Sequence, residues 1–176
     1  NTSKLSYNAK DFSVREIEGK RHIVDTSHNS PELSHYPVHS TFYQIYDNVD
    51  IAVDYEVVSS RIEYGLDVST DIKRATNGLF YPENNLVLSD PMVFRGVVIR
   101  QITFYPYKIN LSTGEVEIFD DVEFSVEEVQ NNENRNYSQV KLSRMFEPLY
   151  ESMIVNYEPS SRDEDYQTPA VLYICG

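Results

Sequence analysis

The sequence has one cysteine, no tryptophan and a shortage of basic residues among its 176 positions. A single cysteine excludes a disulfide framework and a cysteine-based zinc site. Lys and Arg total 15 against 28 Asp and Glu, which gives a formal net charge of -13. A chain this acidic is repelled by phosphate backbones, so we expect no nucleic-acid partner. No apolar run approaches the ~20 residues that cross a bilayer, so we also expect no membrane span.

Aromatic residues, in contrast, are plentiful. The chain has 14 Tyr and 8 Phe, which argues against a disordered acidic tail. Its apolar pattern has a period of two, most clearly over residues 51–58, and this period is typical of strands with one solvated face. Two further apolar runs, 92–109 and 116–126, flank a turn at 110–114 and together predict a hairpin.

Near the end of the chain the period changes. Phe146, Leu149, Tyr150 and Met153 follow the spacing of an amphipathic helix. We therefore predict an all-β fold, an antiparallel, jelly-roll-like β-sandwich of about eight strands with one short C-terminal helix. Residues 1–157 are expected to form this sandwich.

The remaining residues are expected to lie outside the sandwich. Residues 158–169 contain two Pro, four acidic residues and Arg162, a composition typical of an exposed linker. Residues 170–176 are mostly apolar and are expected to be the first strand of a following domain.

Residues 65–85 break the strand pattern with glycine, proline and asparagine. This predicts a loop of roughly 20 residues where ~4–6 is usual, and loops of that length are mostly functional or disordered. Lys73 and Arg74 lie near its middle. Two interpretations stay open. The pair either keeps the loop soluble or is offered to a carboxylate in a partner's pocket, where a guanidinium makes bidentate bonds.

Other reactive side chains carry weaker signals. Cys175 ends an apolar run, where a free cysteine is usually a buried hydrophobe rather than a nucleophile. Two pairs of acidic residues, Asp120–Asp121 and Glu127–Glu128, are adjacent in sequence. Neighbouring residues of a strand point to opposite faces, so the two carboxylates of each pair are not expected to converge on one site. Pro37 argues against a helix that would align metal-ligating histidines, so surface histidines are favoured for His22, His28, His35 and His39. We therefore expect no metal, no cofactor and no catalytic residue.

Several short motifs resemble, in order and spacing, the N-terminal prodomain of gingipain-type cysteine peptidases, which are caspase-like secreted proteases that cleave after Arg or Lys. The resemblance covers about residues 49–176 and is best over 79–158. The matching residues are Glu56-Val57-Val58-Ser59-Ser60, Phe80-Tyr81-Pro82, Leu88-Ser89-Asp90-Pro91, Arg95, Pro106, Asn110, Val116, Ile118, Phe146-Glu147, Leu149-Tyr150, Ser152 and Asn156-Tyr157-Glu158.

This resemblance implies a β-sandwich prodomain that acts as chaperone and inhibitor of the peptidase fused behind it. It implies that a basic loop residue, Arg74 or else Lys73, enters the S1 specificity pocket of the downstream caspase-like domain. It also implies cleavage of the linker after Arg162. The chain would then be no enzyme by itself but part of an exported cysteine endopeptidase precursor, located between the periplasm and the outer surface of a bacterium.

A second class of function remains possible on the residues alone. Sandwich folds host many functions, and a tyrosine-rich sandwich could stack on sugars. The alternative is a non-catalytic binding or adhesion module for glycan or protein on a cell-surface protein.

Overall fold

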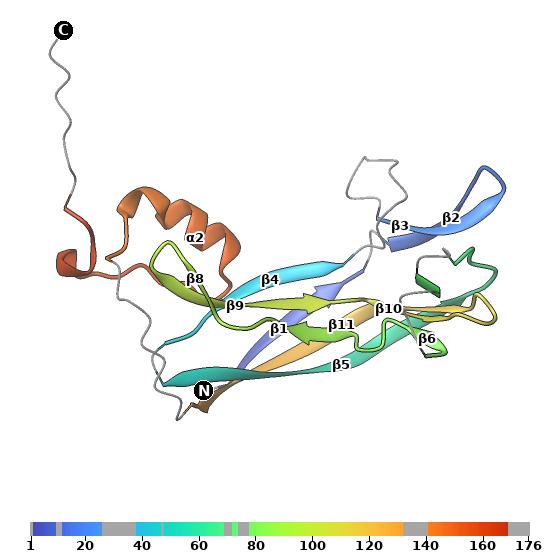
Figure 1. Cartoon of the computed structure of the whole chain (residues 1–176), viewed down its shortest axis with the longest axis horizontal. Helices are drawn as coiled ribbons and strands as arrows, with labels where there is room; N and C mark the ends of the chain where they lie inside the picture. Colours follow the sequence, from blue (N-terminus) through green and yellow to red (C-terminus); the bar gives the residue numbers. More distant parts are fainter. Residues whose placement is uncertain are drawn as a thin grey trace, which may run out of the picture. The chain divides into compact units, whose positions relative to one another are not determined.

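A computed structural model describes residues 2–9, 12–25, 38–46, 48–68, 72–73, 78–131 and 141–168 of the chain (Figure 1). Strands dominate, and the all-β antiparallel sandwich expected from the period of two is confirmed. The strands are β1 (Thr2–Asn8), β2 (Phe12–Ile17), β3 (Lys20–Asp25), β4 (His39–Gln44), β5 (Val49–Glu63), β6 (Phe80–Tyr81), β7 (Leu86–Leu88), β8 (Met92–Phe94), β9 (Val97–Phe104), β10 (Tyr107–Asn110) and β11 (Val116–Gln130).

Three short helical elements follow the strands in the described part of the chain. They are η1 (Arg144–Phe146), α2 (Glu147–Met153) and η2 (Asp163–Asp165). The helix α2 lies where the apolar spacing of residues 146–153 predicted it. Proline occupies its first turn, where the missing N–H costs no hydrogen bond.

The strands form three sheets. One has five strands in the order β1-β11-β10-β6, with β5 also paired to β11. A second has four strands in the order β4-β9-β7, with β8 also paired to β9. The third is the β2–β3 hairpin. The pairing of β1 with β11 is antiparallel and sets Leu5 opposite Phe124.

The chain divides into two compact units that do not follow chain order. Unit 1 comprises Asn1–Ser40, Ile51–Leu88 and Ile102–Val129, and unit 2 comprises Thr41–Asp50, Ser89–Gln101 and Gln130–Gly176. Four of the described strands, β4, β5, β9 and β11, contribute residues to both units.

The core of unit 1 lies between two sheets. Phe104 of β9 and Leu86 of β7 pack with Phe119, Val122 and Phe124 of β11. Inward side chains of two facing sheets that fill one core are the defining feature of a β-sandwich. A second buried cluster of unit 1 is named here the loop-side core, and its buried members are Ala9, Phe12, Ile23, Leu66, Val68, Tyr107, Ile109, Val116 and Ile118.

Unit 2 is built around α2. Tyr150 is fully buried against Val97, Ile99, Ile154 and Tyr157. The hydroxyl of Tyr150 donates a hydrogen bond to a backbone carbonyl in the turn between β8 and β9, at 2.9 Å.

That turn divides the long apolar run expected over residues 92–109. Gly96 is the second residue of a two-residue hairpin loop. Arg95 and Gly96 have φ values of 48° and 91°, and positive φ at both central residues is the requirement of the tight type I′ turn.

Candidate functional site

The loop that carries Lys73 and Arg74 begins at a fixed point on unit 1. The N–H of Leu66 donates to the carbonyl of Gly114 at 2.9 Å, and the N–H of Asp67 donates to the carbonyl of Arg21 at 2.8 Å. Leu66 and Val68 are both buried in the loop-side core. Backbone bonds and apolar packing therefore hold the first residues of the loop.

The loop ends at the same turn where it begins. The N–H of Leu111 donates to the carbonyl of Leu79 at 2.9 Å, and Phe80 of β6 pairs with Asn110 of β10. The side chain of Asn110 accepts hydrogen bonds from two backbone N–H groups of the 110–114 turn, at 3.0 Å and 3.3 Å. Both ends of the loop are thus tied to one braced turn, the arrangement of an Ω-loop.

Between Val68 and Gly78 the structure describes Ile72 and Lys73. Both have helical backbone. Ile72 is half-buried and packs against the loop-side core, whereas Lys73 is exposed. An apolar anchor therefore lies directly before an exposed ammonium group. Arg74 lies outside the described residues.

Arg162 is exposed and caps the N-terminus of η2. Its N–H donates to Ser160 Oγ at 3.2 Å, and its carbonyl accepts from the N–H of Asp165 at 3.2 Å. Its neighbour Asp163 forms an ion pair with Arg144. The basic side chain is accessible, and the backbone of Arg162 is extended, with a φ of -97° and a ψ of 122°. Its N–H and its carbonyl are nevertheless both hydrogen-bonded.

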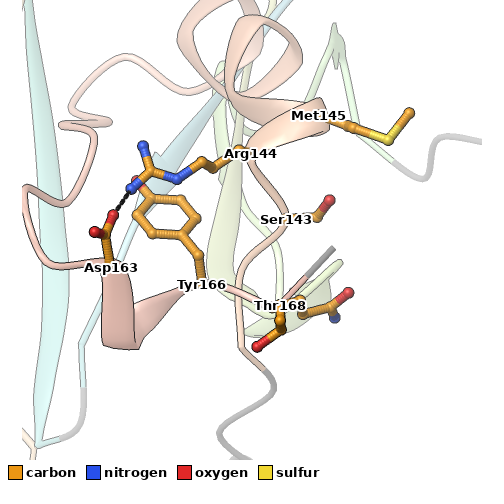
Figure 2. A pocket seen from close by; sticks show the side chains of 7 residues that line it. Ser143, Arg144, Met145, Asp163, Tyr166 and Thr168 are labelled. Carbon is orange, nitrogen blue, oxygen red and sulfur yellow. Dashed lines mark hydrogen bonds and ion pairs between the residues drawn. The ribbon is translucent and has the colours of Figure 1, made fainter. Parts of the chain in front are cut away.

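Sequence reasoning missed the residue that organises this segment. Tyr166 was expected in an exposed linker, but it is only 3% exposed. Arg144 lies over its ring at 4.3 Å, as Figure 2 shows for these two side chains. The Tyr166 hydroxyl donates to the carboxylate of Glu147. No periodicity signals such a contact, because one isolated aromatic residue reaches a helix far away in sequence. An aromatic residue within an otherwise polar segment was the available clue.

Burial and the hydrogen bond to Glu147 raise the pKa of the Tyr166 hydroxyl above its ordinary value. Burial also raises the pKa of the neighbouring Tyr157 hydroxyl. A tyrosine hydroxyl is protonated at neutral pH even at its ordinary pKa of ~10, and the upward shift of the Tyr166 pKa is consistent with its hydroxyl donating a hydrogen bond to a carboxylate.

A cavity of about 520 Å³ lies beside Tyr166 in unit 2. Figure 2 shows the Arg144–Asp163 ion pair on its wall. The lining residues come from the start of η1 and the residue before it, and from η2 and the residues after it. They are Ser143, Arg144, Met145, Asp163, Tyr166, Gln167 and Thr168.

The acidic pair Asp120–Asp121 has structural partners. Asp120 forms an ion pair with Arg61, and Asp121 accepts hydrogen bonds from Ser59, at 2.7 Å, and from Asn8. Each carboxylate of the pair thus has its own partner, and the two do not converge on one site.

Of the four histidines, the structure describes His22, which lies in β3, and His39, which lies in β4. His28, His35 and Cys175 lie outside the described residues. Within the described ranges, no three His, Cys, Asp or Glu side chains are grouped to hold a metal ion. None of the helices in those ranges is long and apolar enough to cross a membrane.

The solved structures that are similar to this chain include two from Porphyromonas gingivalis. The complex of the pro- and mature domains of RgpB from Porphyromonas gingivalis matches with a TM-score of 0.57 at 19% identity, over 89% of this chain and 93% of that one. The structure on zymogenic latency of gingipain K, from the same organism, matches with a TM-score of 0.51 at 12% identity, over 73% of this chain and 86% of that one. At these identities the likeness shows the fold. No curated protein sequence matches the chain.

A match to a family model supports a more specific assignment of this chain than the fold alone. Residues 36–163 match the family described as Propeptide_C25. This range includes β4 to β11, α2 and Arg162. Since the match spans well over half of the sequence, the chain belongs to the Propeptide_C25 family, the propeptides of gingipain-type cysteine peptidase precursors.

Proposed function

We propose that this propeptide keeps an exported gingipain-like cysteine peptidase latent by placing a basic side chain of its 66–79 loop in the S1 pocket of the downstream catalytic domain. The role is assigned to Arg74, with Lys73 as the second candidate. The chain is itself non-catalytic, since it is the propeptide part of a cysteine endopeptidase precursor. We further propose that it assists folding of the catalytic domain, and that the precursor acts between the periplasm and the outer surface of a bacterium.

The observation that carries this proposal is the double attachment of the loop to the 110–114 turn. Leu66 and Leu79, near the two ends of the loop, each bond to that turn, and Ile72 packs on the loop-side core. A loop held in this way loses less conformational entropy on binding than a free one. It also resists cleavage, because a substrate-like peptide bond held out of line with a nucleophile is not attacked efficiently.

The first test is inhibition of the separately produced catalytic domain by this chain, measured with Arg- and Lys-based fluorogenic substrates. We expect tight inhibition by the native chain. We expect Arg74→Ala to raise the inhibition constant at least tenfold, because truncating one partner of a buried charge pair costs ~2–5 kcal/mol. Lys4→Ala is the matched control, because Lys4 is an exposed cation on β1 of unit 1 and should leave inhibition unchanged.

The possible outcomes separate the details of the proposal. A larger loss with Lys73→Ala than with Arg74→Ala would reassign the pocket-binding side chain. Unchanged inhibition by both variants and by the double variant would exclude the substrate-mimic mechanism. An active catalytic domain that the native chain does not inhibit would leave only the folding role.

We also propose that the precursor is cut after Arg162. The supporting observations are an exposed Arg162 side chain and the position of this residue near the end of the family match. An exposed basic residue is what a peptidase specific for Arg or Lys would recognise at this position.

A further inference from the structure

We infer that residues 160–167, called the clasp below, mask the peptide bond between Arg162 and Asp163, and that Tyr166 holds the clasp closed. The inference rests on the proposed processing after Arg162 and adds a regulatory step to it. The bond becomes cleavable only when the clasp opens. The clasp and all the residues that hold it belong to unit 2.

The bond lies at the start of a hydrogen-bonded turn. The Arg162 carbonyl accepts from the Asp165 N–H at 3.2 Å, and the Arg162 N–H donates to Ser160 Oγ at 3.2 Å. The Asp163 carboxylate is paired with Arg144. A peptidase must align its nucleophile at ~3–3.5 Å from the carbonyl carbon. Residues on both sides of the bond would have to break these contacts to follow a substrate cleft.

Tyr166 joins the clasp to two neighbouring elements with one side chain. Its hydroxyl donates to Glu147 Oε1 at the start of α2 and lies 3.1 Å from the carbonyl oxygen of Ser160. Its ring lies 4.3 Å below the guanidinium of Arg144 in η1 (Figure 2). Because the ring is 3% exposed, opening the clasp exposes a large apolar surface and separates a buried donor from its carboxylate.

Backbone bonds hold the chain on both sides of Tyr166. The Leu142 N–H donates to the Asp165 carbonyl at 2.9 Å, and the Gln167 N–H donates to the Leu142 carbonyl at 2.7 Å. The Gln167 side chain adds a bond to the Lys141 carbonyl at 3.0 Å. Leu142 and Tyr166 form a parallel bridge. These bonds and the buried ring form one small cooperative structure, which opens as a unit.

The clasp therefore separates recognition from cleavage. The Arg162 side chain is displayed to a peptidase while the bond that follows it is protected. Where opening and closing are fast, the cleavage rate follows the population of the open state. A change that opens the clasp should then accelerate cleavage without changing the recognised residue.

The test uses trypsin as a probe, since it cleaves after Arg and Lys independently of the catalytic domain. Native chain, Tyr166→Ala and a free peptide of residues 156–168 are digested under native conditions, and cleavage after Arg162 is followed by mass spectrometry. We expect the free peptide to be cut at least tenfold faster than the native chain, and Tyr166→Ala to approach the peptide rate. Tyr64→Ala, at a 61% exposed tyrosine of unit 1, should behave as the native chain does.

Cleavage after Arg100 reports on unfolding of unit 2, because its side chain is only 15% exposed and is paired with Asp50. The proposal requires that Arg100 stays protected in Tyr166→Ala while Arg162 is cut rapidly. Hydrogen exchange at the Leu142 and Gln167 amides gives a second measure. Both should exchange slowly in the native chain and faster in the variant.

Equal cleavage rates for the native chain and the free peptide would overturn the clasp. So would an unchanged rate in Tyr166→Ala with Arg100 still protected. The comparison of native chain and peptide needs no variant, so it decides the question even where Tyr166→Ala unfolds unit 2. Failure of the processing proposal is a separate result. It would appear as a different mass of the propeptide released during maturation of the precursor, with the clasp intact.

Discussion

At the scale of the residue, Gly114 combines a left-handed backbone with a close backbone contact, and a residue with a Cβ atom could keep neither without strain. Its φ is +70°, a conformation that L-residues adopt only with strain. A Cβ atom at this residue would lie 2.6 Å from the carbonyl oxygen of Leu66. The glycine therefore permits the close backbone approach from which the proposed inhibitory loop starts.

We expect Gly114→Ala to destabilise the chain by more than the left-handed backbone alone would cost. Gly19→Ala is the matched control, since Gly19 has a φ of +77° but no atom within 4 Å of its would-be Cβ. The control should cost roughly 1–2 kcal/mol from strain. Gly114→Ala should cost at least about 1 kcal/mol more, because backbone atoms must move. Urea denaturation followed by circular dichroism measures both, and equal losses would contradict the close approach.

His39 gives a pH dependence of known sign. It is half-buried, and its ring lies 4.5 Å from that of Tyr7 between centroids. Burial lowers its pKa from 6.5. The folded state therefore disfavours the protonated ring, and its contribution to stability is fully present above the unfolded pKa. That contribution is lost as the pH falls toward the folded pKa.

We expect His39→Gln to reduce the loss of stability between about pH 7.5 and about pH 5.5, the range in which an exposed histidine titrates. The measurement is the urea midpoint of native and variant chains at both pH values. Because the many carboxylates titrate in both chains, the quantity of interest is the difference between them. A difference that is the same at both pH values would contradict a role for His39.

At the scale of the element, α2 is held to the β8–β9 hairpin through Tyr150. Its hydroxyl donates to the carbonyl of Arg95 at 2.9 Å, and the Arg95 guanidinium lies 4.0 Å over the ring of Phe146. Arg95 has a φ of 48°, which is uncommon for a residue with a Cβ. These two contacts help to keep the strained turn in place.

Tyr150→Phe tests the polar part of this attachment. We expect a loss of about 1 kcal/mol in the free energy of unfolding, because the ring stays buried while one carbonyl loses its donor. Tyr150→Ala removes the fully buried ring as well, and we expect it to lower the free energy of unfolding by ~3–5 kcal/mol. Leu149→Ala is the control on the same helix. Because Leu149 is 37% exposed, this variant should lose less stability than Tyr150→Ala. No change in Tyr150→Phe would mean that water satisfies the Arg95 carbonyl equally well.

The elements that sequence reasoning predicted are those with strong periodicity. The alternation of 116–126 appears as β11, and the helical spacing of 146–153 appears as α2. β1 went unnoticed because only Leu5 and Tyr7 are apolar within Thr2–Asn8. Its pairing with β11 comes from tertiary contacts, which a seven-residue segment does not encode by itself.

The candidate site was predictable in part for the same reason. Glycine, proline and asparagine marked the long loop, and charge singled out Lys73 and Arg74. The attachment of Leu66 to Gly114 was not predictable, since it joins backbone groups far apart in the sequence. The burial of Tyr166 was hidden by the acidic, proline-containing segment around it, whose composition is typical of an exposed linker.

At the scale of the whole molecule, composition was a better guide to fold class than to organisation. Period two and a high aromatic content are properties of the entire chain, so the antiparallel sandwich could be predicted. The division into two units mixes segments from the beginning, middle and end of the chain. Local patterns carry no information about which distant segments share a core.

The braced turn at 110–114 has a consequence for how such propeptides can diversify. Both ends of the loop are secured by backbone bonds to this turn, and Val68 and Ile72 add apolar packing in its first half. The residues between Ile72 and Leu79 are therefore the part of the loop whose sequence can vary most freely. Doubling the length of a flexible loop costs only ~0.6 kcal/mol in closure entropy. A new basic residue, or a longer or shorter segment, between Ile72 and Leu79 should therefore have little effect on the stability of the sheets, so that inhibitory specificity can change while the fold is kept.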